Sequence, residues 1–140
     1  MSRKKPRENP LPFLFLVGLS GWIIPGGGYF LLKETKRAVI IFVTIVLTFV
    51  LGIYIGSIGV IDPIGTIGDR LWYFVQMMNS PFVAIIGRFT AGGGYPVFGR
   101  PNEMGKLYTG IAGLLNLLCI VNAVYLAYMQ KTASSEHGNA

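Results

Sequence analysis

Residues 38–60 read AVIIFVTIVLTFVLGIYIGSIGV and contain no charged side chain over twenty-three positions. A helix rises about 1.5 Å per residue, so about 20 apolar residues cross the ~30 Å hydrocarbon core of a bilayer. The many β-branched residues would favour a strand in water. In lipid an isolated strand leaves its backbone polar groups unpaired, whereas a helix pairs them internally. The stretch therefore predicts a transmembrane helix over residues 38–60.

A second uncharged stretch lies near the other end of the chain. Residues 107–129 carry no charge and Lys131 follows them, which predicts a second full transmembrane helix over 107–129. The remaining residues, 132–140, are small and polar, so we expect a disordered tail there.

The apolar segment at residues 11–32 is interrupted by Pro25-Gly26-Gly27-Gly28. No convincing small-x-small cleavage site follows it, which favours a retained anchor over a signal peptide. Leu11 to Ile24 gives only about 21 Å of helix. We therefore expect a broken or re-entrant first segment that dips in, turns at the Pro-Gly run and returns.

The basic residues around this segment support a return to the starting side. Residues 1–10 form a basic tail, and Lys33, Lys36 and Arg37 follow the segment. The positive-inside rule assigns such clusters to the cytoplasm. Both are cytoplasmic only if residues 11–32 do not fully cross, and the loop 61–106 is then expected outside.

That loop contains a further apolar stretch, residues 71–89. It is broken by Gln76, Asn79, Ser80 and Pro81. We expect either an interfacial or re-entrant helix, or a kinked span that adds a fourth membrane helix. Residues 11–131 together are expected to form a single, all-α transmembrane domain.

Overall composition agrees with a location in a membrane. The 140 residues are 52% hydrophobic and 13% charged, with a mean hydropathy of +0.56. The formal net charge of +6 arises from short clusters beside apolar segments and not from a basic stripe, which argues against nucleic acid as a partner. We expect a multi-pass protein of a bacterial inner membrane, with the lipid bilayer as its first partner.

Small and polar residues within the spans indicate helix packing. Gly52 and Gly56 lie four apart on one helix face, which suits intramolecular packing or a contact between copies in a homo-oligomer. Asn116 and Asn122 are the strongly polar side chains of the last span. Because an amide is costly in lipid, we expect both to face protein and to form interhelical hydrogen bonds.

Chemistry-bearing residues are sparse. The single histidine, His137, lies in the polar tail, and the single cysteine, Cys119, lies within an apolar run. Asp62, Asp69 and Glu103 are expected to be solvated or paired with neighbouring cations. We therefore predict no catalytic, cofactor-binding or metal-ligating residue and no enzymatic activity.

Two stretches carry a family resemblance. Gly21-Trp-Ile-Ile-Pro-Gly-Gly-Gly-Tyr-Phe30, and Ala112-Gly-Leu-Leu-Asn-Leu-Leu118 with Asn122-Ala123, resemble two signatures of an uncharacterised family of small bacterial integral membrane proteins. That family is distantly similar to proteins with a paired-transmembrane-helix domain. Tyr29 stands where histidine is common and Asn122 where aspartate is usual, so the resemblance implies no role for those ionisable groups here.

These features favour a protein that works by contact. We expect an accessory or scaffold subunit that packs against a larger membrane complex, of which a respiratory or photosynthetic complex is one type. The alternative is a small stand-alone channel or carrier, which the absence of charge in the spans disfavours.

Overall fold

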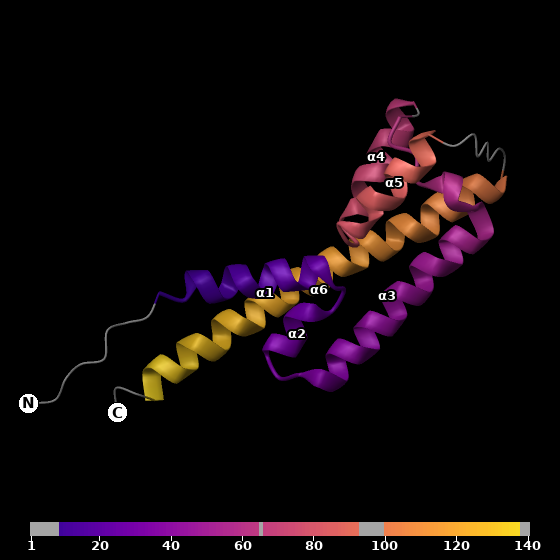
Figure 1. The fold of residues 1–140 in the computed structure, drawn as a ribbon. Helices are drawn as coiled ribbons and strands as arrows, with labels where there is room; N and C mark the ends of the chain where they lie inside the picture. Colours follow the sequence, from indigo (N-terminus) through magenta and orange to yellow (C-terminus); the bar gives the residue numbers. More distant parts are fainter. Residues whose placement is uncertain (1–8, 65, 93–99, 138–140) are drawn as a thin grey trace, which may run out of the picture.

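The computed structural model describes residues 9–64, 66–92 and 100–137, and these residues form helices and turns without a strand (Figure 1). Two helices are long and apolar enough to cross a membrane. In chain order the elements are α1 (Leu11–Ile23), α2 (Gly27–Leu31), α3 (Thr35–Gly56), the 3-10 turn η1 (Ile58–Val60), α4 (Ile67–Met77), α5 (Phe82–Gly92) and α6 (Arg100–His137).

Helices α3 and α6 form an antiparallel pair that contains the two predicted spans. A Cβ placed at Gly52 would lie 2.7 Å from Thr109 Cγ2, and one at Gly56 would lie 2.8 Å from the Gly105 Cα. The two glycines therefore let α3 approach α6 closely, which confirms the intramolecular interpretation of their spacing. The helix pair diverges toward the end where α3 begins (Figure 1).

Helices α1 and α2 form a short hairpin that packs between the diverging ends of α3 and α6. Helix α1 runs beside the second half of α6, since Lys131 lies 5.4 Å from the Phe13 ring and a Cβ at Gly21 would meet Ile120. The chain then turns at Pro25-Gly26, and α2 doubles back toward the start of α3. The broken, returning first segment expected from the sequence is thus present.

Helices α4 and α5 form a second hairpin at the opposite end of the pair. Helix α4 begins beside Lys106 and ends at Met77, near the middle of α6. The chain turns at Asn79-Ser80-Pro81, and α5 returns until Thr90 Oγ1 donates a hydrogen bond to the Ile61 carbonyl. Residues 71–89 are therefore two short helices, which agrees with the re-entrant alternative and not with one kinked span.

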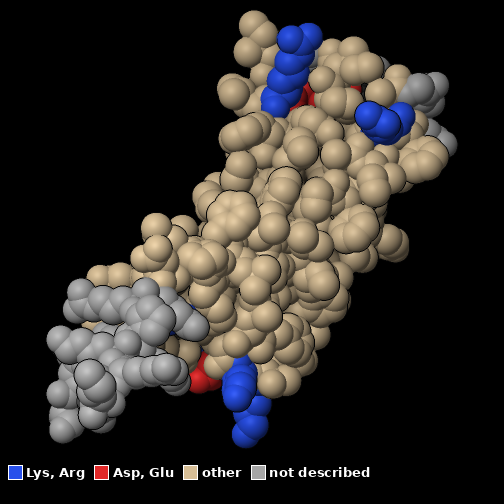
Figure 2. All heavy atoms as spheres, turned by 60° about the vertical axis from the view of Figure 1, so that its left-hand side comes forward, with Lys and Arg blue, Asp and Glu red and all other residues tan. Residues whose placement is uncertain are grey.

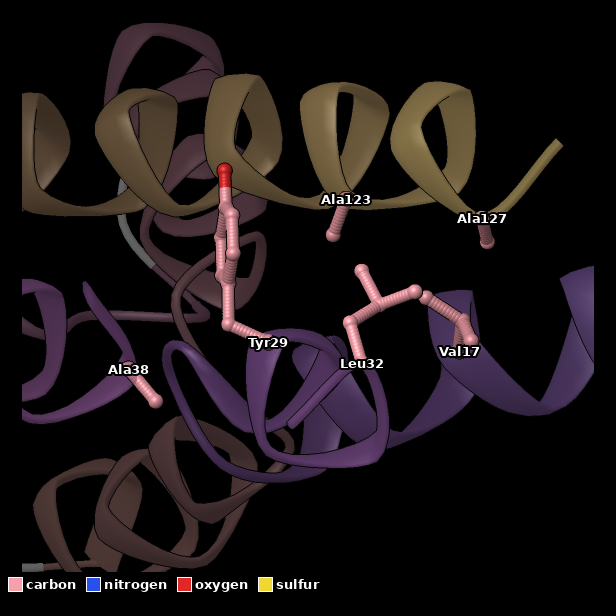
Figure 3. Packing of buried hydrophobic residues seen from close by; sticks show 6 residues of the cluster. All are labelled: Val17, Tyr29, Leu32, Ala38, Ala123 and Ala127. Carbon is pink, nitrogen blue, oxygen red and sulfur yellow. The ribbon is translucent and has the colours of Figure 1, made fainter. Parts of the chain in front are cut away.

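The core of the first hairpin is small and tightly packed. Figure 3 shows Val17 and Leu32 directed toward α6, where Ala123 and Ala127 face them, and Tyr29 reaching the same helix. The alanines allow the hairpin to lie close to α6. A second buried cluster joins α3, α5, α6 and the residue after η1 through Ile45, Phe49, Ile61, Val83 and Ala112.

Two boundaries differ from the sequence prediction. Helix α6 extends beyond 107–129 at both ends, so residues 132–137 of the expected disordered tail are helical. Its 38 residues give about 57 Å of helix, well beyond what ~30 Å of hydrocarbon requires. Helix α3 begins at Thr35 and ends at Gly56, a few residues earlier than expected. Residues 1–8 of the basic tail and residues 138–140 lie outside the described part.

Candidate functional site

The most polar part of the interior lies where the turns of the two hairpins meet beside the middle of α6. Helices α1 and α4 both end there, at Ile23 and Met77. The last carbonyls of a helix have no partner within it, and two such ends placed in an apolar interior need donors from elsewhere. We call this region the hairpin junction and define it by Trp22, Ser80 and Asn116 with the carbonyls that they bind.

Asn116 supplies the central donor. Its side chain is fully buried, and Nδ2 lies 3.2 Å from the Gly21 carbonyl oxygen, 3.1 Å from that of Met78 and 2.7 Å from that of Asn79. One amide on α6 therefore binds backbone from both hairpins. The expectation that Asn116 faces protein and bonds between helices is confirmed.

Two further side chains tie the hairpins to each other. Trp22 Nε1, in α1, donates to the Met77 carbonyl at 3.1 Å, and Ser80 Oγ, after α4, donates to the Ile23 carbonyl at 3.0 Å. Each hairpin thus caps the terminal carbonyls of the other. Sequence reasoning did not assign these roles, because both contacts join residues more than fifty positions apart.

A second polar contact lies nearer to η1. Gln76 Nε2 donates to Thr109 Oγ1 at 2.8 Å and to the Val60 carbonyl at 3.4 Å, and both side chains are fully buried. Thr109 in turn donates to the Gly105 carbonyl of its own helix at 2.8 Å. Gln76 therefore links α4 to both α6 and η1 by hydrogen bonds.

The glycines of the Pro25-Gly26-Gly27-Gly28 run let the turn between α1 and α2 pack closely against α1 and α3. Gly26 has φ +79°, in the left-handed region, and a Cβ there would lie 2.8 Å from the Ala38 carbonyl oxygen. A Cβ at Gly27 would lie 2.4 Å from the Ser20 carbonyl oxygen. The run is a tight turn packed against α1 and α3, which agrees with its interpretation as a helix break.

The two positions that depart from the resembled signature are bonded to each other. Asn122 Nδ2 donates to Tyr29 Oη at 2.8 Å, so an amide and a phenol meet where the signature implies an ionisable pair. Tyr29 is buried, but Asn122 is exposed. The expectation that Asn122 faces protein is thus met only in part.

Of the three loop carboxylates, Asp69 is ion-paired, as expected. Lys106 Nζ pairs with Asp69 Oδ1, and Asp69 Oδ2 accepts hydrogen bonds from the backbone N–H and hydroxyl of Thr66 at 2.9 and 2.7 Å. The Lys106 hydrogen bond, followed by that from Thr66, holds the pKa of Asp69 below its usual range. Thr66 and Asp69 form a capping box at the start of α4.

The geometry explains what the junction does physically. Its donors bind helix-terminal carbonyls, and the amide oxygens of Asn79 and Asn116 are buried without a partner among the described residues. No group of three or more potential metal-ligating side chains occurs in the described ranges. The arrangement is suited to holding two hairpins in one place.

A model of a known protein family covers most of the chain. The model of a family of unknown function, DUF6677, matches residues 16–135. The chain belongs to this family. The match includes both hairpins and both long helices, from most of α1 to nearly the end of α6. No match was found among curated proteins or among solved structures.

Proposed function

We propose that this DUF6677 member is a multi-pass protein of a bacterial cell membrane that works, without catalysis, as an accessory or scaffold subunit of a larger membrane complex. The observation that carries the proposal is the exposed apolar surface of its two long helices.

The long helices are far too exposed for the core of a water-soluble protein. In the most apolar 18-residue window of α3 only 17% of residues are buried, and in that of α6 only 33%. Ile40, Leu47 and Leu118 are each more than half exposed. Water-soluble monomers rarely show contiguous apolar surface of this extent, so lipid or another protein is expected to cover it.

Among the described side chains, the charged ones lie toward the two ends of the molecule. Figure 2 shows Lys and Arg at opposite poles, with a long uncharged surface between them. This distribution is that of a protein with both ends in water and its middle in hydrocarbon. Because α1 and α3 begin at the pole where α6 ends, the clusters at Lys33, Lys36 and Arg37 and at Lys131 suit the cytoplasmic face.

The polar side chains of the interior are used within the molecule, which supports a role that depends on contact between the outer surface and another protein. Trp22, Ser80 and Asn116 use their donors on carbonyls of the chain itself, so these polar groups are committed to holding the hairpins. What remains available for function is the outer surface. An exposed helix face whose partner is another membrane protein is the simplest use of such a surface.

The arrangement of the hairpins favours a second candidate, a small carrier. Two discontinuous helices that approach the middle from opposite sides are a recurring feature of secondary transporters, in which the breaks bind substrate or ion. Here the carbonyls at the breaks are already bound by side chains, which weighs against it. A carrier would show solute-dependent stabilisation of the purified protein that Asn116→Asp abolishes.

Photo-crosslinking in native membranes tests the subunit proposal. A photoreactive amino acid at Leu47, 55% exposed on α3, is expected to give a reproducible crosslink to one other membrane protein. The same probe at Ile45, which is buried on the same helix, is the matched control and should give none to other chains. Native gels of the complex after mild extraction should then show both chains at a fixed ratio.

Only lipid adducts from Leu47 and the other exposed α3 positions, with the protein migrating alone on the native gel, would contradict the subunit role. Release of the protein from membranes by alkaline carbonate would contradict the membrane placement itself.

A further inference from the structure

An open apolar groove runs along helix α1. It has a volume of about 460 Å³ and is lined by six residues of α1 and one of α6, which are Leu11, Leu14, Phe15, Gly18, Leu19, Trp22 and Val124. The α1 members recur at intervals of three and four residues, so they lie on one face of that helix. We call this feature the α1 groove.

Gly18 keeps the middle of the α1 groove open. A Cβ placed at Gly18 would lie 3.5 Å from Val124 Cγ2, which is an ordinary contact, and would meet no other atom within 4 Å. A large side chain at this position would therefore take up part of the groove.

The lining leaves no polar group for an occupant. Trp22 is the only lining residue with a polar side-chain atom, and its Nε1 donates to the Met77 carbonyl at 3.1 Å. The other lining side chains are aliphatic or phenyl groups, apart from the glycine. An occupant that lies along this surface needs no hydrogen-bonding group there, which is the property of a hydrocarbon chain.

The length of the groove corresponds to one leaflet of a bilayer. Leu11 to Trp22 is about 16 Å of helix, and half of a ~30 Å hydrocarbon core is about 15 Å. Helix α1 begins at the pole where α6 ends, and it ends at the hairpin junction beside the middle of α6. The groove therefore extends from one edge of the expected hydrocarbon region to its centre.

The groove is narrow compared with a protein helix. Its volume divided by its length gives a mean cross-section of about 28 Å². A helix about 10 Å across has a cross-section of about 80 Å². A single extended chain is therefore a better fit to the groove than a helix of a second protein.

The end of the groove at Leu11 lies at a positively charged pole. Lys131 Nζ lies 5.4 Å from the centroid of the Phe13 ring, which places its charge beside the first turn of α1. The described charged side chains of this pole are four cations and one carboxylate, namely Lys33, Lys36, Arg37, Lys131 and Glu34. A ligand with a hydrocarbon chain in the groove and a negative group at this end is complementary to both features.

We propose that the α1 groove binds one acyl chain of an anionic phospholipid of the cytoplasmic leaflet, with the lipid headgroup beside Lys131. The inference rests on the membrane placement proposed above. It is independent of the partner protein, because the crosslinking probe at Leu47 lies on α3 and the groove lies on α1.

Quenching of Trp22 fluorescence by brominated lipids tests the site. In a Trp72→Phe background Trp22 is the only tryptophan, and it lies at the inner end of the groove. The purified protein is reconstituted in phosphatidylcholine vesicles that contain the same mole fraction of either brominated phosphatidylglycerol or brominated phosphatidylcholine, with bromine near the chain end. The anionic lipid is expected to quench with an apparent affinity about fivefold higher, the effect of one cation near the lipid surface.

Variants separate the headgroup contact from the groove. Lys131→Gln should bring the affinity ratio of the two lipids close to one, whereas Lys36→Gln, at the same pole on α3, should change it less. Quenching by both lipids should decrease in the order parent, Gly18→Ala, Gly18→Leu, because the added side chain displaces the acyl chain. Val43→Leu, at a 47% exposed position of α3, is the control for added volume and should leave Trp22 quenching unchanged.

Equal quenching by the two lipids, or a preference that Lys131→Gln leaves intact, would overturn the anionic-lipid site and make the groove ordinary lipid-facing surface. Absence of quenching by either lipid would mean that protein covers the groove, and this would also overturn the proposal. In these cases the membrane placement stands, because its own failure is the separate observation that alkaline carbonate releases the protein.

Discussion

Single side chains in this protein act mainly on the backbone of other helices. Asn116, Trp22 and Ser80 each donate to a carbonyl near the end of a short helix, at 2.7–3.2 Å. A helix that ends inside an apolar region leaves up to four carbonyls without an intrahelical partner. Side-chain donors at the hairpin junction therefore permit the helices to stop there instead of continuing.

The first prediction concerns Asn116. Asn116→Leu introduces an apolar side chain of similar size and removes the donor to the Gly21, Met78 and Asn79 carbonyls. Loss of a donor to buried acceptors costs about 1–3 kcal/mol, so the thermal midpoint in mild detergent should fall by several degrees. Thr48→Val, which removes a hydroxyl bound only within α3, is the control and should change stability little. An unchanged midpoint for Asn116→Leu would show that the amide is dispensable.

A second prediction concerns Asp69. Its pKa is lower in the folded protein than in the unfolded chain, chiefly because of the Lys106 hydrogen bond and then that of Thr66. A lowered carboxyl pKa contributes stability that is fully present above the unfolded value of 3.8 and is lost as pH falls through the folded value. Unfolding midpoints should therefore decrease on acidification below about pH 4.

Asp69→Asn is the matched variant for this pH dependence. It should be less stable than the parent at neutral pH and should lose less stability between pH 4 and more acidic solution. Equal acid sensitivity of the two proteins would assign the effect to other carboxyl groups.

At the scale of the elements, close approach of helices depends on the absence of side chains. A Cβ at Gly113 would lie 2.1 Å from the Val75 carbonyl oxygen, and one at Gly110 would lie 2.7 Å from the Trp72 ring. Helix α4 is thus seated directly on α6 at these two positions. The glycine surfaces that the sequence offers for a partner are used within the molecule.

The third prediction follows from that contact. Gly113→Ala forces α4 away from α6 because the clashing atom is backbone, and overpacking of this kind typically costs about 1–3 kcal/mol. Gly18→Ala is the control, since its Cβ would lie 3.5 Å from Val124 Cγ2, an ordinary contact, and alanine favours a helix. Thermal unfolding should rank Gly18→Ala at or above the parent and Gly113→Ala well below it. The reverse order would contradict the seating of α4.

The sequence predicts elements whose cause is local and misses those whose cause is tertiary. Residues 38–60 and 107–129 are recognisable because hydropathy and length suffice, and the Pro25-Gly26 break is visible because those residue types interrupt helices. Whether residues 71–89 turn back or continue depends on Ser80 meeting Ile23 and on Asn79 meeting Asn116. Contacts between residues so far apart in the sequence leave no periodic pattern, so the hairpin junction could not be predicted from the sequence.

Across the whole molecule, the same order of elements occurs twice in opposite directions. A broken hairpin precedes a long helix in α1–α2–α3 and again in α4–α5–α6, and the two long helices are antiparallel (Figure 1). In each hairpin the proline of the turn stands fourteen residues after the first helical residue, Pro25 after Leu11 and Pro81 after Ile67. The two hairpins enter from opposite ends and meet beside the middle of α6, where Asn116 binds both.

The last prediction tests this arrangement in the membrane. Single cysteines at Asn9, Thr35 and Thr132, in a Cys119→Ser background, lie at the pole where α1 and α3 begin and α6 ends, and Ile64→Cys lies at the other. A membrane-impermeant maleimide should label Ile64→Cys in intact cells and the other three only after the membrane is opened, because the basic clusters assign their pole to the cytoplasm. Ile64 is 64% exposed, so lack of labelling there is not explained by burial. Labelling of Asn9→Cys and Thr35→Cys from opposite sides would mean that residues 11–32 cross fully, and the hairpins could then not meet at Asn116.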